Sequence, residues 1–199
     1  FHFLTVFLAA ALIFTWWGVL GVGRRPLEVV FLDVGQGDAI FMQTPGGKNI
    51  LLDAGGKPVY RGNIAETGHL VVVPFLEHRR IKKLDLVIVS HPHEDHYGGL
   101  FAVLEKIPVK MLAINDEIPE EGPYLELLAL ARDKGISREI LGAGDYLTVE
   151  PALEICVLNP PRELWQGTDS DTNNNSLVVH LRYKDAGLLL TGDVETAAV

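Results

Sequence analysis

Four residues that commonly bind metal ions lie within six positions, and this run is the feature that most constrains the fold. It reads His-Pro-His-Glu-Asp-His over residues 91–96 and follows the apolar segment Leu86–Ser90, which is typical of a buried strand. The glycine pair Gly98–Gly99 follows. A strand that ends in such a loop brings imidazoles and a carboxylate together, and the run contains no cysteine that could supply a thiolate. The run therefore predicts a site for zinc, manganese or iron. The alternative is a surface loop that is merely rich in histidine and acid.

Several further motifs surround this run: Phe31–Ala39 (FLDVGQGDA), Leu51–Gly56 (LLDAGG), Asn173–Leu177 (NNNSL) and Leu190–Asp193 (LTGD). With the histidine run, they resemble the metallo-β-lactamase superfamily. The closest resemblance within it is to the C-terminal hydrolase domain of ComEC-type (ComEC/Rec2) competence proteins, which are membrane proteins of bacterial DNA uptake. The resemblance extends over residues 28–195. It implies an α/β fold, specifically the four-layer αββα sandwich of metallo-β-lactamases.

The same resemblance implies a centre that holds two divalent metal ions. His91 and His93 would bind one ion, Asp95 and His96 the other, and Asp193 would bridge them. Asp95 is also the expected catalytic residue that takes a proton from a water between the ions. The alternative for Asp193 is an ordinary turn residue, because Gly-Asp is common in turns.

Residues of three other motifs are expected around this centre. In the superfamily, the residue that corresponds to Asp53 braces the metal loop through hydrogen bonds, although a turn-forming Asp is the alternative. The alternating glycines of Val34–Asp38 permit positive φ, so Gln36 could bind substrate and Asp38 could contact substrate or water in catalysis. An ordinary hairpin turn is the alternative there. The amides and hydroxyl of Asn174, Asn175 and Ser176 suit phosphate oxygens, and a plain polar loop is the alternative.

Two departures from the wider superfamily are visible. The third-motif histidine is absent, and Asp171, Thr172 and Asn173 occupy its region; His180 lies within a predicted strand and is not expected to bind metal. The coordination of the first metal would be completed by a water, a substrate phosphate or an oxygen from Asp171, Asn174 or Ser176. More oxygen donors shift the preference toward manganese or magnesium. The family's final histidine motif would lie beyond Val199, so the hydrolase domain, residues 24–199, is expected to be truncated at its C-terminus.

The N-terminal stretch Phe3–Val22 contains no charged residue and is long enough to cross a bilayer as a helix. We therefore predict a transmembrane helix over residues 1–23, the end of a larger multi-pass membrane region of the same protein. A signal peptide and a buried helix are the alternatives. This prediction places the protein at the bacterial cell membrane, with the hydrolase domain on the extracytoplasmic side.

The remaining pattern alternates strands and helices. Apolar runs over residues 27–33, 38–44 and 49–53 predict an antiparallel meander, and residues 99–106 and 123–134 predict helices. Strands are expected again at residues 139–141, 146–149, 153–158, 176–183 and 187–190. The lone cysteine, Cys156, lies in the apolar run 153–158 and is expected in the core.

These features favour a metal-dependent phosphodiesterase, a nuclease that degrades one strand of imported DNA. Single-stranded DNA is the expected partner, although the net charge of −9 gives little electrostatic attraction and the basic run His78–Lys83 is the only cationic segment. Two alternatives remain. One is a metallo-hydrolase of a small ester, lactone or β-lactam, and the other is a non-catalytic metal-binding module of a DNA channel.

Overall fold

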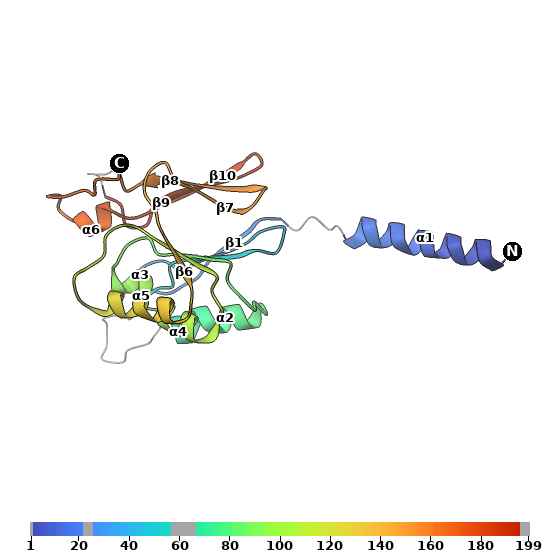
Figure 1. Cartoon of the computed structure of the whole chain (residues 1–199), viewed down its shortest axis with the longest axis horizontal. Coiled ribbons are helices and arrows are strands. Elements are labelled where there is room, and N and C mark those ends of the chain that lie inside the picture. The colour runs from blue at the N-terminus through green and yellow to red at the C-terminus, as the bar shows by residue number, and fades with distance from the viewer. Residues whose placement is uncertain (1, 22–25, 57–66, 196–199) are drawn as a thin grey trace.

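The computed structural model describes residues 2–21, 26–56 and 67–195, and within these ranges two stacked sheets form a sandwich (Figure 1). The first sheet has the strand order β1-β2-β3-β4-β5-β6. Its strands are β1 (Glu28–Phe31), β2 (Ile40–Gln43), β3 (Asn49–Leu52), β4 (Leu86–Ile88), β5 (Met111–Ile114) and β6 (Ser137–Ile140). Strands β1 to β3 pair antiparallel, which confirms the predicted meander, and β3 to β6 pair parallel.

The second sheet is antiparallel and has the order β10-β9-β8-β7. Its strands are β7 (Tyr146–Glu150), β8 (Leu153–Asn159), β9 (Val178–Tyr183) and β10 (Ala186–Leu190). Helices α2 (Val73–His78), α3 (Glu94–Tyr97), α4 (Leu100–Lys106) and α5 (Pro123–Asp133) cover the outer face of the first sheet (Figure 1). A π-helical turn, η1 (Gly68–Val72), leads directly into α2.

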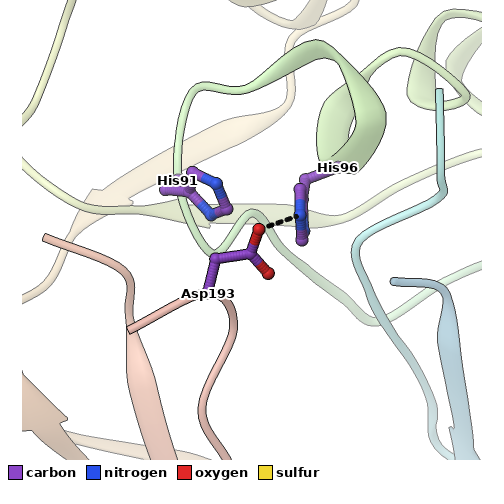
Figure 2. A group of neighbouring side chains, drawn as sticks. All are labelled: His91, His96 and Asp193. Carbon is purple, nitrogen blue, oxygen red and sulfur yellow. Dashed lines mark ion pairs between the residues drawn. The ribbon is translucent and has the colours of Figure 1, made fainter. Parts of the chain in front are cut away.

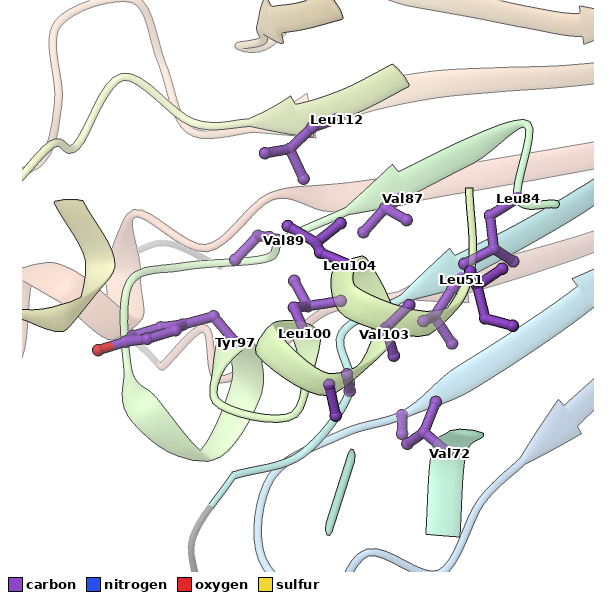
Figure 3. Packing of buried hydrophobic residues seen from close by; sticks show 14 of the residues in the cluster. Leu51, Val72, Leu84, Val87, Val89, Tyr97, Leu100, Val103, Leu104 and Leu112 are labelled. Carbon is purple, nitrogen blue, oxygen red and sulfur yellow. The ribbon is translucent and has the colours of Figure 1, made fainter. Parts of the chain in front are cut away.

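The period-two alternation of the central strands divides the core into two layers. In β3, Leu51 packs toward the helices, while Ile50 and Leu52 pack toward the second sheet. In β4, Val87 joins the helix side, where it packs with residues such as Leu100 of α4 (Figure 3). Because both faces of these strands are buried, their sequences are almost continuously apolar.

The predicted fourth layer is not found among the described residues. Turns of only two residues join β7 to β8 and β9 to β10, and the only described helix after β6 is the four-residue α6 (Asp171–Asn174). Neither tight turn has room for a covering helix. The described part of the chain is therefore an αββ sandwich, and Tyr146, Leu158 and Leu189 of the second sheet are more than half exposed.

The placement of Cys156 in the core is wrong. Leu153, Ile155 and Val157 of β8 point into the sandwich, so the alternation of the strand turns Cys156 to the outer face. The apolar run is real, but only every second residue in it faces the core.

The N-terminal helix α1 (His2–Gly21) carries exposed apolar side chains, among them Phe3, Phe7 and Phe14. Within the residues that the structure describes, no helix combines the length and the apolar character needed to span a membrane. The transmembrane helix predicted over residues 1–23 is therefore not supported by the structure.

Candidate metal centre

The candidate centre lies where the parallel strands of the first sheet end, beside one end of the second sheet. Asp53 follows β3, and Ser90 and His91 follow β4. Asp193 comes from the second sheet, three residues after Leu190 ends β10, and its carboxylate points toward the histidines (Figure 2). The carboxyl ends of neighbouring parallel strands share one edge of a sheet, which explains why residues far apart in sequence meet here.

Three histidines and one carboxylate converge at this edge. His91 Nε2 lies 3.0 Å from His93 Nδ1, and His96 Nε2 lies 3.3 Å from Asp193 Oδ2. One ligand atom each from His91, His96 and Asp193 fit within 4.8 Å of one another (Figure 2). His91 and His96 are fully buried, whereas the Asp193 side chain is 41% exposed, so the group is open on that side.

The donor atoms fit a bound cation. His96 Nε2 is buried, and it faces Asp193 Oδ2 at 3.3 Å without an ideal hydrogen-bond geometry, an arrangement that also lets both atoms face one cation. Two ring nitrogens facing each other at 3.0 Å also suit a shared metal. Imidazole and carboxylate donors without thiolate are compatible with zinc, iron or manganese.

Asp53 braces the loop that carries the histidines. Its carboxylate accepts hydrogen bonds from the Ser90 N–H at 2.8 Å and the Ser90 hydroxyl at 2.6 Å, and lies 2.8 Å from His96 Nδ1. Asp53 is fully buried and has a φ of 54°, a conformation that Asp tolerates better than most residues. A proton on His96 Nδ1 directed at this carboxylate leaves Nε2 free to bind a metal.

Sequence reasoning missed Ser90. Besides its bonds to Asp53, its hydroxyl lies 3.0 Å from His91 Nδ1 and 3.3 Å from His96 Nδ1. The signal was present, since a small polar residue stands between a buried strand and the first histidine of the run. Its contacts, however, depend on Asp53, 37 residues away.

Ser176 reaches the centre from the other sheet. Its hydroxyl lies 3.2 Å from His91 Nδ1 and accepts a hydrogen bond from the Asp193 N–H at 3.3 Å. The next residue, Leu177, donates its N–H to the Ser90 carbonyl at 2.8 Å and so joins the two sheets. Ser176 therefore contacts one residue of the centre from each sheet, His91 from the first and Asp193 from the second.

The amides of Asn174 and Asn175 are occupied by the protein. Asn174 donates to the Thr168 hydroxyl and accepts from the Glu195 N–H, while Asn175 both donates to and accepts from the Trp165 backbone. Asp171 accepts from Gly167 and Thr168 in the same loop. These contacts shape the loop, and substrate binding by Asn174 and Asn175 stays a prediction.

The glycine turn before β2 behaves as its sequence predicts. Gly35 and Gly37 have φ values of 82° and 72°, and a Cβ at Gly37 would lie 1.9 Å from the Asp95 carbonyl oxygen. This close approach brings the Asp38 carboxylate within 4.8 Å of ligand atoms of Asp53 and His96. Gln36 is exposed, and its substrate role stays a prediction.

The Asp95 carboxylate belongs to neither group of converging ligands among the described residues. Its predicted roles as ligand and proton acceptor therefore stay predictions. His180 lies in β9 opposite Cys156 of β8 and Leu189 of β10, on the outer face of the second sheet. It takes no part in either group.

Burial and neighbouring charges separate the protonation states of the histidines. Burial, with the positive charges of His96 and His93, lowers the pKa of His91 to about 3. Burial also opposes the charge on His96, but hydrogen bonds and attraction from Asp193 and Asp53 outweigh it and raise the pKa of His96 to about 10. Burial is also the main reason why the pKa of Asp38 is raised. Without metal, the His91 imidazole is therefore neutral and the His96 imidazole is charged at neutral pH.

Comparisons with known proteins agree with this geometry. Residues 32–198 match the family described as the Metallo-beta-lactamase superfamily. The chain is 32% identical over 176 residues to ComE operon protein 3 of Bacillus subtilis, covering 84% of this chain and 22% of that protein. It is 27% identical over 178 residues to Competence protein ComA of Neisseria gonorrhoeae, covering 88% and 21% respectively. The chain thus spans about a fifth of the length of these relatives.

A solved structure shares the fold at low sequence identity. CmlA, a diiron β-hydroxylase from Streptomyces venezuelae, superposes with a TM-score of 0.53 at 17% identity, over 85% of this chain and 30% of that protein. At this identity the similarity establishes the fold alone. The α/β sandwich of this chain is thus also found in a known structure.

Proposed function

Because the chain belongs to the metallo-β-lactamase superfamily, we propose that it is the hydrolase domain of a DNA-uptake protein and that it cleaves phosphodiester bonds in single-stranded DNA. The observation that carries this proposal is the convergence of His91, His96 and Asp193 at an edge that opens to solvent. Two divalent cations, manganese or zinc with magnesium also suitable, would supply a nucleophilic water at neutral pH and neutralise phosphate charge.

The residues of this chain prepare the site for that chemistry. His91 and His93 offer facing nitrogens, and His96 and Asp193 offer a second pair of donors. Asp53 and Ser90 hold the two buried imidazoles in place, so little rearrangement is needed when substrate binds. Asp38, beside His96, is placed to accept a proton or to orient a water, and burial raises its pKa.

Two features favour a phosphodiester over a carboxylic ester. First, Asp171, Thr172 and Asn173 occupy the region of the third-motif histidine, so oxygen donors rather than an imidazole would complete the coordination of the first metal. Second, a relative over most of this chain is named a competence protein. The net charge of −9 means that bound cations, rather than lysine and arginine, would neutralise most of the phosphate charge.

In this proposal the domain lies at the bacterial cell membrane on the extracytoplasmic side, where incoming DNA is met, and is joined to a multi-pass region of the same protein. The charge-free sequence over residues 3–22 and the greater length of the relatives support the attachment to a membrane region, whereas the side follows from the proposed substrate. Protease accessibility in spheroplasts would test the side of the membrane.

The test is hydrolysis of labelled single-stranded and duplex DNA with manganese, zinc or magnesium. His93→Ala and Asp193→Ala should abolish metal-dependent cleavage. His180→Ala is the matched control, because this histidine lies on the outer face of the second sheet, and it should cleave like the parent. Circular dichroism would confirm that each variant is folded.

The results distinguish three functions. Metal-dependent cleavage that is lost only in the site variants supports the nuclease and identifies its ion. Hydrolysis of a nitrophenyl ester or a β-lactam without DNA cleavage would replace the substrate class. Metal binding without turnover on any of these substrates would leave a metal-binding module and contradict the proposal.

A further inference from the structure

Trp165 is a large aromatic side chain that is rigidly held and yet exposed. It lies in the loop between β8 and α6, and 37% of its surface is accessible to solvent. The indole N–H donates to Asn159 Oδ1 at 3.1 Å, and the backbone exchanges two hydrogen bonds with the Asn175 amide at 2.8 and 3.1 Å. One hydrogen bond therefore holds the ring and two hold its backbone, while more than a third of the residue stays exposed.

The same anchors connect Trp165 to the candidate metal centre. The Asn159 amide group that accepts from the indole also donates to the Ser176 carbonyl at 2.8 Å. Ser176 in turn contacts His91 through its hydroxyl. The exposed ring and the centre are thus attached to one short segment, residues 174–176.

We propose that Trp165 is the stacking platform for an unpaired nucleobase next to the cleaved phosphate. This inference rests on the proposed function and specifies its substrate as single-stranded nucleic acid. Stacking on an aromatic ring accepts any base, and a ring that is already fixed loses little entropy when a base binds. With a net charge of −9, lysine and arginine give the phosphates little attraction, so stacking supplements the bound cations in holding the strand.

Substitutions at one position separate stacking from a merely structural role. Trp165→Phe and Trp165→Leu both remove the hydrogen bond to Asn159, but only Phe keeps an aromatic face. For cleavage of a dT12 oligonucleotide, we expect Trp165→Leu to raise KM about tenfold with kcat little changed. Trp165→Phe should stay within about threefold of the parent KM. Tyr146→Ala, an exposed aromatic on the outer sheet, is the control and should leave KM unchanged.

Binding can be followed without cleavage. In a Trp16→Phe, Trp17→Phe background, Trp165 is the only tryptophan of the chain. In EDTA, dT12 should quench its fluorescence in a saturable manner, because stacked bases quench indole emission. An abasic 12-mer, which has the same phosphates without bases, and a duplex of equal length should quench much less.

The two proposals fail in different ways. Quenching by dT12 without cleavage in any metal would remove the nuclease and keep the base platform. Cleavage of dT12 with no quenching, and with equal KM for the parent, Phe and Leu proteins, would keep the nuclease and overturn the platform. Equal KM increases in Phe and Leu would also overturn it, because the hydrogen bond to Asn159 would then be what matters.

Discussion

Asp53 Oδ2 and His96 Nδ1 lie 2.8 Å apart, and both side chains are fully buried. The pair joins the end of β3 to the loop after β4, and it fixes which nitrogen of His96 faces the open side of the centre. The same carboxylate holds Ser90 through two further hydrogen bonds. A single buried acid thus determines the orientation of most of the metal loop.

Asp53→Asn should lower metal affinity by 10- to 100-fold, the usual effect of losing such an orienting group, although Asp53 itself need not touch the ion. An amide cannot accept from both Ser90 and His96 with the strength of a carboxylate. Isothermal titration calorimetry with manganese or zinc measures this effect. Asp133→Asn, an exposed aspartate in α5, is the control, and an unchanged Kd for Asp53→Asn would contradict the bracing role.

Metal loading should release about one proton per protein from His96 at pH 8, in addition to any proton from metal-bound water. The raised pKa of His96, about 10, keeps this imidazole charged in the metal-free protein, and a metal can bind only the neutral form. His91, with a pKa of about 3, contributes no proton. Apparent affinity should therefore rise with pH up to about 10.

The proton count comes from calorimetry of metal binding in buffers of different ionisation enthalpy. In Asp53→Asn the pKa of His96 should fall, so proton release at pH 8 should also fall. An identical proton count in the parent and in this variant would argue against the Asp53–His96 pairing in solution.

Gly35→Ala and Gly37→Ala form a matched pair in one turn. Both positions have positive φ, so each substitution carries a backbone strain of about 1 kcal/mol. A Cβ at Gly35 meets nothing within 4 Å, whereas at Gly37 it would lie 1.9 Å from the Asp95 carbonyl oxygen. Urea unfolding should show Gly37→Ala to be less stable than Gly35→Ala by roughly 2 kcal/mol or more, a typical overpacking penalty. Equal losses would mean that the turn can move away from Asp95.

Ser176→Ala should reduce kcat for the proposed cleavage by about fivefold, since it removes a contact with His91 worth about 1 kcal/mol that orients the centre. The fold should be retained, because the hydrogen-bond partners of the hydroxyl among residues 26–56 and 67–195 are His91 and the Asp193 N–H. Ser137→Ala, whose hydroxyl bonds the Lys110 carbonyl far from the centre, is the control. A kcat equal to that of the parent would show that Ser176 is not needed to position His91.

The sequence was most informative where the functional residues are neighbours in the chain. The run over residues 91–96 follows a strand directly, so its position at a strand end could be predicted, and so could the glycine turn before Asp38. Asn159 and Ser90 could not be found in this way, because their importance lies in partners 17 and 37 residues distant. Cys156 was misplaced because a continuous apolar run does not reveal which residues face outward.

The hydrogen bond from Leu177 N–H to the Ser90 carbonyl crosses from one sheet to the other beside the centre. The ligands are divided in the same way, with the histidines on the first sheet and Asp193 on the second. A cation bound by the histidines and by Asp193 would therefore link the two sheets of the sandwich. Docking of the two sheets and assembly of the centre would then be one event, and metal would stabilise the folded chain in proportion to RT ln(1 + [M]/Kd).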